Sequence, residues 1–275
     1  MIHTVATVLA ADGPIAARLP GYEPRPQQIE MASAVDRAFV DGGHLIVEAG
    51  TGVGKSFAYL VPAIAQAARG NKVVVATGTI ALQEQLIGKD IPFLIAATDA
   101  DVVAELVKGR GNYLCIRRLA QASRQHQMLF ADGDDVADLD AIVEWAYATV
   151  DGSLADLPRQ PSPAVWEQIR SDADNCLGAR CPHQGKCFFQ RARRRAAAAD
   201  LLVANHALFL SDLGLRRAGA AGILPEHDRV VIDEAHGLEA VAGDHFGLAV
   251  SDLQVRMLLN TLFNPRTGRG LLIPL

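Results

Sequence analysis

The feature that most constrains this chain is a glycine-rich segment, residues 49–56, with the sequence Ala-Gly-Thr-Gly-Val-Gly-Lys-Ser. It follows a short apolar run, His44 to Val47, and precedes a stretch of helix formers from Phe57 to Ala68. This order predicts a strand, a glycine loop and a helix. The alternating glycines permit backbone angles that side chains forbid, so successive amide N–H groups can point at one anion.

The segment fits the phosphate-loop pattern, except that its first position is Ala49 instead of glycine. Lys55 would place a positive charge at the β and γ phosphates of a nucleotide, and the Ser56 hydroxyl at the helix start could bind Mg²⁺. A structural glycine turn is the alternative, but it does not need the Gly-Lys-Ser ending. The residues predicted to hold ATP here are Ala49, Gly50, Thr51, Gly52, Val53, Gly54, Lys55 and Ser56.

A second acidic motif follows the apolar residues 230–232, where Asp233 and Glu234 precede Ala235 and His236. Two carboxylates at the end of a buried strand are costly unless a cation or water meets them. Alone, such a pair could simply begin a helix. Together with the loop, it predicts that Asp233 helps Ser56 to hold Mg²⁺ and that Glu234 orients and deprotonates the attacking water, with Lys55 as the third catalytic residue.

Apolar runs elsewhere continue an alternation of strands and helices. A helix is predicted over residues 80–87, and strands over residues 72–76, 101–107, 201–204 and 229–232. Strands separated by helices indicate an α/β fold, with a parallel sheet, helices on both faces and ligands at the carboxyl ends of the strands.

Between Lys108 and Ala199 the pattern changes to arginine, aspartate, proline and cysteine without clear strands, which predicts an inserted unit of about 90 residues. All four cysteines of the chain lie in it: Cys115, Cys176, Cys181 and Cys187. Structural zinc sites commonly use pairs of cysteines two residues apart, and this segment has none. The looser spacing favours an iron–sulfur cluster, with zinc and four unrelated thiols as alternatives.

Charge is distributed unevenly along the chain. The net charge is -5, yet residues 175–195 contain six arginines and lysines and no acidic residue. Such a basic segment is typical of contact with a phosphate backbone, while a solvated helix face is the alternative. No run of eighteen apolar residues and no secretory signal is present, so a cytoplasmic protein without membrane contact is expected.

With these motifs assembled, the chain resembles the DinG/XPD family of iron–sulfur superfamily 2 DNA helicases from about residue 22 to residue 236. Residues 25–31 are similar to the family's adenine-sensing segment, with Arg25 and Gln28 at the nucleotide. Residues 77–86 resemble its motif Ia, whose Thr77, Thr79 and Gln83 would touch the DNA backbone. Residues 108–115 and 205–208 resemble the segments that flank the iron–sulfur domain.

The resemblance implies a RecA-like P-loop lobe carrying a mainly helical iron–sulfur insertion. Its cofactors would be ATP, Mg²⁺ and a 4Fe-4S cluster on the four cysteines. Its activity would be ATP-driven 5'–3' translocation on single-stranded DNA, with unwinding of forks, D-loops or R-loops and a role in DNA repair. Arg191 and Arg194 of the basic segment would guide the strand by phosphate contacts, and His236 would couple the nucleotide site to the DNA.

The family pattern also requires a second motor lobe whose arginines complete the ATP site, and only 37 residues follow Leu238. We therefore expect a fragment with slow turnover. Its expected parts are lobe 1 (residues 1–107 and 200–240), the insertion (108–199) and the start of an arch domain (241–275). Two other hypotheses remain: a module that binds ATP and single-stranded DNA without unwinding, and a P-loop ATPase that acts on proteins through a zinc-containing insertion.

Overall fold

The computed structural model describes residues 4–50, 52–126 and 133–246, together with Val255, Leu259, Leu262 and Phe263. The described chain divides into two compact units, residues 1–235 and residues 236–275. The first unit contains a parallel sheet and its helices. The second contains helix α13 (Leu238–Phe246). Most of the predicted arch segment, residues 241–275, lies outside the described residues.

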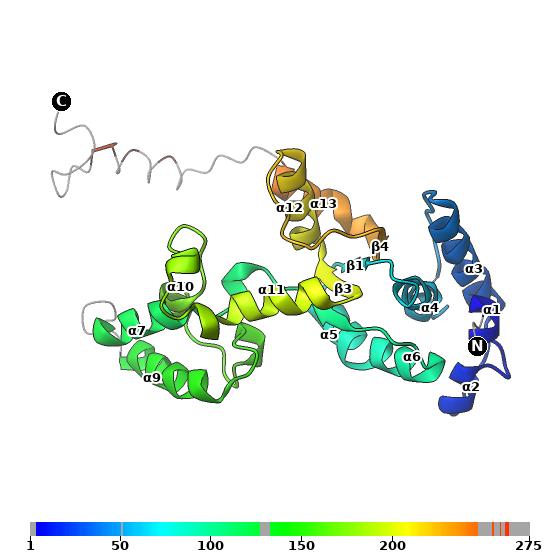
Figure 1. The fold of residues 1–275 in the computed structure, drawn as a ribbon, viewed down its shortest axis with the longest axis horizontal. Helices are drawn as coiled ribbons and strands as arrows, with labels where there is room; N and C mark the ends of the chain where they lie inside the picture. Colours follow the sequence, from blue (N-terminus) through cyan, green and yellow to red (C-terminus); the bar gives the residue numbers. More distant parts are fainter. Residues whose placement is uncertain are drawn as a thin grey trace. The chain divides into compact units, whose positions relative to one another are not determined.

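Figure 1 shows the order of the elements along the chain. Four strands form the sheet: β1 (Val73–Thr77), β2 (Ala104–Leu106), β3 (Leu201–Asn205) and β4 (Arg229–Ile232). The helices of the first unit are α1 (Val5–Val8), α2 (Pro14–Arg18), α3 (Pro26–Asp41), α4 (Lys55–Ala67), α5 (Ile80–Gln85), α6 (Ile91–Thr98), α7 (Ile116–Arg124), α9 (Gly133–Ala148), α10 (Pro163–Ile169), α11 (Phe188–Ala198) and α12 (His206–Arg217). A π-helical turn, Leu86–Asp90, joins α5 to α6. No helix in the described ranges has the length and apolar character needed to cross a lipid bilayer.

The sheet has the order β2-β3-β1-β4. Every pair is parallel, which confirms the predicted parallel sheet. Alternate residues of the central strands enter different cores because successive side chains point to opposite faces. Val73 and Val75 of β1 pack with helices α1, α3, α4 and α6, whereas Val74 and Ala76 pack with the end of α11 and with α12. Helices therefore cover both faces.

One predicted strand is wrong. Residues 44–47 are not a strand, and their side chains are open to solvent, with Ile46 98% exposed. A strand needs a neighbour to satisfy its backbone N–H and C=O groups. The ladders of the described sheet end at β4, and they include no partner for this run. Its apolar composition alone could not supply that partner.

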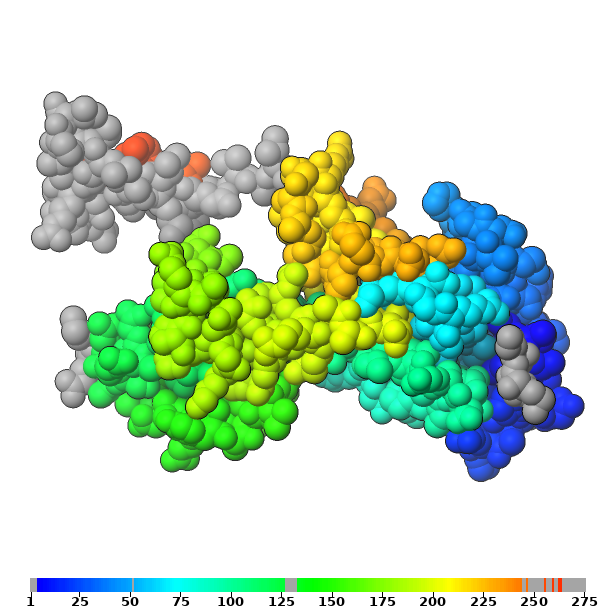
Figure 2. Space-filling view, viewed as in Figure 1, coloured from blue at the N-terminus to red at the C-terminus, as the bar shows by residue number. Residues whose placement is uncertain are grey.

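The inserted segment has its own hydrophobic core. Residues from α7, α9, α10 and α11 surround Trp166, Phe188 and Phe189, separately from the two cores that flank the sheet. Figure 2 shows the corresponding green residues gathered beside the sheet-bearing part of the same unit. Arg195 of α11 connects the two parts, with 2.8 Å from its Nε to Glu105 Oε1 of β2 and 3.0 Å from its Nη2 to Asp151 Oδ1.

Candidate nucleotide-binding site

The glycine loop ends at the first turn of α4. Gly52 and Gly54 have φ angles of 82° and 84°, a region that residues with a Cβ rarely adopt, and Gly54 is the N-terminal cap of the helix. The helix begins at Lys55, so its first amide groups are free for a ligand at the loop, and Lys55 Nζ donates to the carbonyl oxygen of Ala49 at 3.4 Å. Thr51, one of the predicted loop contacts, lies outside the described residues.

The first turn of α3 and its N-terminal cap, Arg25, hold the loop directly. Gln28 is buried and its Nε2 donates to the carbonyl oxygen of Gly54 at 2.9 Å, while Arg25 Nη1 donates to the carbonyl oxygen of Gly52. A Cβ on Gly54 would lie 2.2 Å from Gln28 Nε2, so this approach requires glycine. The hydroxyl of Tyr22 donates to Gln28 Oε1 at 3.1 Å. Sequence reasoning missed Tyr22, whose only signal was an aromatic residue just before the Arg-Pro-Gln-Gln segment.

The two acidic residues of the second motif meet the loop helix. Lys55 Nζ lies 3.7 Å from Glu234 Oε1, and both side chains are partly exposed. The Tyr59 hydroxyl donates to Asp233 Oδ2 at 2.9 Å across 174 sequence positions. Burial raises the pKa of Tyr59 far above its ordinary value, and the Asp233 carboxylate raises it further, so the phenol remains a donor. The structure thus brings Lys55, Asp233 and Glu234 together, and it adds Tyr59, which the sequence did not predict.

This arrangement can bind a phosphate and a divalent cation. Asp233 is 8% exposed, and its carboxylate is held by Tyr59 and by the backbone N–H of Glu234, which donates to Asp233 Oδ1 at 3.0 Å. A carboxylate fixed in this way, next in sequence to the Glu234 that pairs with Lys55, suits Mg²⁺, whose preferred ligands are oxygens. Glu234 is more exposed and can meet a water molecule.

The four cysteines are free thiols on short turns of the insertion. Cys115 precedes α7 and Cys187 precedes α11. A 3-10 turn at 178–180 lies between Cys176 and Cys181, and another at 184–186 lies between Cys181 and Cys187. The backbone N–H of Gly178 and then the Arg110 guanidinium lower the pKa of the Cys176 thiol. Four thiols are suitable donors for iron–sulfur or zinc, yet within the described ranges no three His, Cys, Asp or Glu side chains are gathered to hold a metal ion.

The predicted DNA contacts have different environments. Thr77 and Gln83 are buried, at 0% and 6% exposure, so this conformation does not present them to a DNA strand. Thr79 is exposed, and it caps α5 because its hydroxyl oxygen accepts a hydrogen bond from the Leu82 N–H at 3.3 Å. Arg191 donates to the carbonyl oxygen of Val150, and its guanidinium carbon lies 5.0 Å from the Phe188 ring centroid. Arg194 is exposed on α11.

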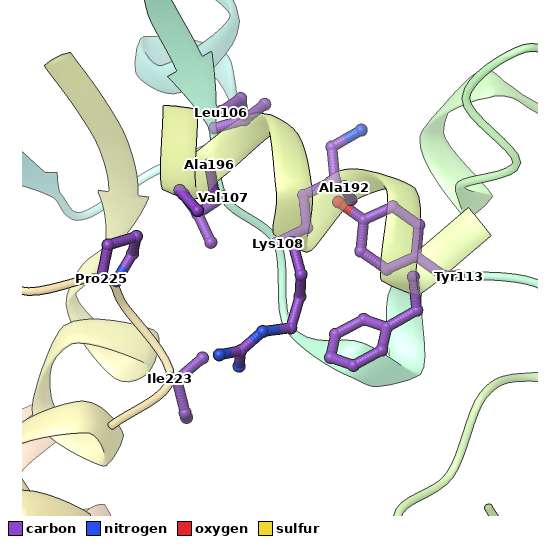
Figure 3. A pocket seen from close by; sticks show the side chains of 11 residues that line it. Leu106, Val107, Lys108, Tyr113, Ala192, Ala196, Ile223 and Pro225 are labelled. Carbon is purple, nitrogen blue, oxygen red and sulfur yellow. The ribbon is translucent and has the colours of Figure 1, made fainter. Parts of the chain in front are cut away.

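A small cavity of about 110 Å³ lies beside this basic helix. Figure 3 shows Ala192 and Ala196 of α11 on one side, and Val107, Tyr113 and Ile223 around it. Arg193 and Lys108 also line the cavity. It therefore combines apolar walls with two cationic side chains, next to the exposed Arg194.

A glycine loop before a helix, with a lysine and an acidic pair at the end of a parallel strand, defines the class of P-loop nucleotide-binding domains. Comparison with known proteins is more specific. Residues 25–131 match the DEAD/DEAH box helicase family. The chain therefore carries a DEAD/DEAH box helicase domain, and over most of its length it is similar to DinG-like helicases.

Three relatives illustrate the similarity. The chain is 39% identical over 251 residues to the ATP-dependent DNA helicase YoaA of Escherichia coli, which covers 90% of this chain and 38% of that protein. It is 42% identical over 242 residues to the ATP-dependent helicase DinG of Mycobacterium tuberculosis, covering 81% and 35%. It is 31% identical over 247 residues to a Bacillus subtilis protein named 3'-5' exonuclease DinG, covering 89% and 26%. The chain thus spans less than two fifths of each relative.

Proposed function

We propose that this chain is the first motor lobe of a DinG-type DNA helicase and that it binds Mg²⁺-ATP. The observation that carries the proposal is the pair of contacts between α4 and the end of β4, Lys55 to Glu234 and Tyr59 to Asp233. Lys55 would hold the β and γ phosphates, Ser56 and Asp233 the ion, and Glu234 the attacking water. The similarity to proteins named as ATP-dependent helicases supports this role.

Nucleotide binding tests the proposal. Titration with a fluorescent, non-hydrolysable ATP analogue and Mg²⁺ should give saturable binding. Lys55→Ala should weaken it by roughly 10- to 100-fold, since a charge-assisted hydrogen bond contributes about 1.5–3 kcal/mol. Lys89→Ala, a lysine in the π-helical turn, is the matched control. Binding that is equal in wild type and Lys55→Ala would contradict the proposed ATP site.

We further propose that hydrolysis drives 5'–3' movement on single-stranded DNA and the opening of forks, D-loops or R-loops, in the cytoplasm, once a second motor lobe supplies arginines to the site. The exposed Thr79 and Arg194, with Arg193 at the cavity beside α11, support a DNA path on this lobe. The chain alone should hydrolyse ATP slowly. If the chain binds ATP and single-stranded DNA, but DNA does not stimulate ATP hydrolysis, the binding-module alternative would be supported instead.

We propose that the four cysteines hold a 4Fe-4S cluster. Support comes from the four free thiols on one inserted segment, with spacings that are looser than those of zinc sites. Cluster formation would have to draw the turns that carry Cys176, Cys181 and Cys187 together with Cys115. Anaerobic purification followed by iron, sulfide and zinc analysis tests this proposal, and zinc without iron would contradict it.

A further inference from the structure

A buried histidine at the start of α12 contacts the acidic motif that follows β4. His206 is the first residue of α12, directly after β3, and is 2% exposed. Its Nε2 lies 2.8 Å from the backbone carbonyl oxygen of Asp233. A carbonyl oxygen can only accept, so this nitrogen must carry the hydrogen. The contact therefore determines the tautomer of the ring, with Nε2 protonated.

The peptide that His206 contacts is under backbone strain. It joins Asp233 to Glu234, and Glu234 has a φ of 52°, in the left-handed region that residues with a Cβ disfavour. Such a conformation persists when surrounding contacts determine it. This peptide is held at both of its polar groups: His206 Nε2 donates to the Asp233 carbonyl, and the Glu234 N–H donates to Asp233 Oδ1 at 3.0 Å.

The direction of the Glu234 side chain follows from that turn. Its Cβ direction depends on the left-handed φ, and its Oε1 lies 3.7 Å from Lys55 Nζ. If the Asp233 carbonyl lost its donor, the peptide could rotate and Glu234 could relax toward an ordinary φ. The carboxylate would then leave its place beside the loop lysine, while the loop and α4 would be unchanged.

We propose that His206 is a positioning residue for Glu234, acting through the Asp233 carbonyl. The inference rests on the proposed function for the role of Glu234 in hydrolysis, but the contact itself does not depend on that function. Loss of the donor should lower the rate of the hydrolytic step without weakening ATP binding, because the loop, Lys55 and the Gln28 contact to Gly54 do not involve His206.

Two variants separate the hydrogen bond from the volume of the ring. His206→Gln places an amide nitrogen at a distance along the side chain similar to that of Nε2 and retains a donor. His206→Phe keeps a ring of similar shape without a donor.

The test compares the 275-residue wild type with both variants. Single-turnover ATP hydrolysis with single-stranded DNA should fall roughly 10- to 100-fold in His206→Phe, since a misplacement of about 1 Å can cost about 10²-fold in rate. It should recover in His206→Gln, with analogue affinity in all three proteins equal within about twofold. Rate and affinity falling together in His206→Phe would overturn the proposal, as would an unchanged rate.

Hydrogen–deuterium exchange of a peptide spanning residues 229–237 gives a readout that needs no nucleotide. Exchange should speed up in His206→Phe and return to the wild-type rate in His206→Gln. If the wild type fails to bind or hydrolyse ATP, the proposed function is wrong, and the exchange experiment still tests His206. Equal exchange in all three proteins would overturn the positioning role of His206. His227→Phe is the control, because His227 Nδ1 contacts the Pro225 carbonyl at 2.9 Å and not the acidic motif.

Discussion

The nucleotide site and the cysteine-bearing insertion differ in how completely the chain alone arranges their functional groups. In the nucleotide site, Lys55 and Tyr59 contact carboxylates at the far end of the sequence. In the insertion, four thiols lie on turns, without a gathered metal-binding group among the described residues. The nucleotide-site residues lie at the start of a helix and the end of a strand, and the sheet determines these positions. The four thiols lie on short turns, and metal binding is commonly coupled to the folding of such ligands.

The two regions also have separate hydrophobic cores, one around the sheet and one around Trp166 and Phe188. Perturbing one should therefore leave the other largely intact, because mutations at distant sites without shared partners act nearly independently. Substitutions in each region test this comparison.

The largest effect is expected from Glu234→Gln. The change keeps the side-chain size but removes the proposed base, and hydrolysis should fall by about 10²- to 10⁴-fold in a single-turnover assay. Affinity for the ATP analogue should change by less than about threefold, since the phosphate loop is untouched. Glu226→Gln, at an exposed carboxylate paired with Arg216, serves as the control. Equal hydrolysis in Glu234→Gln and wild type would exclude the proposed base.

Cys187→Ser should remove most of the iron from anaerobically purified protein, because a cubane cluster needs four strong ligands. Nucleotide affinity should stay within about twofold of wild type. Iron and sulfide analysis together with the analogue titration checks both statements. Full iron content in Cys187→Ser would show that Cys187 is not a cluster ligand. A loss of nucleotide affinity in this variant would show that the two regions are coupled.

Gly152→Ala should destabilise the insertion by about 2–4 kcal/mol. Gly152 has a φ of 69°, and a Cβ there would lie 2.2 Å from the Phe188 ring, so strain and overlap combine. Urea unfolding followed by tryptophan fluorescence measures the loss, since Trp166 lies in this core. Gly185→Ala is the matched control, because its Cβ would meet open space at an ordinary φ. A similar loss in both variants would refute the close-approach explanation.

The smallest effect concerns the basic helix. Arg194→Gln should weaken single-stranded DNA binding modestly and reduce the slope of log affinity against log salt by about 0.7, the expected share of one phosphate contact. Arg191→Gln should act mainly on stability, because that guanidinium is bound to the Val150 carbonyl and lies over Phe188. Arg69→Gln, at an exposed arginine after α4, is the control. An unchanged salt slope in Arg194→Gln would remove this residue from the DNA path.

Much of the fold could be predicted from local patterns. Apolar runs at residues 72–76, 201–204 and 229–232 predicted the strands β1, β3 and β4, because such runs between helices are typical of parallel sheets. Residues 44–47 carry the same signal, and their prediction failed. A run of this kind shows that a segment can pair, but not whether a neighbouring strand is in place.

The candidate site divides in the same way. The sequence by itself determined the phosphate loop, its lysine and the acidic pair, because each is a short pattern whose local geometry follows from glycine, a helix start or a strand end. Only the tertiary structure decided that Gln28 would hold the loop through Gly54, that Tyr59 would donate to Asp233, and that His206 would meet the Asp233 carbonyl. Those contacts join segments 26 to 174 positions apart, and no local pattern specifies which buried donor will face which acceptor once the strands are aligned.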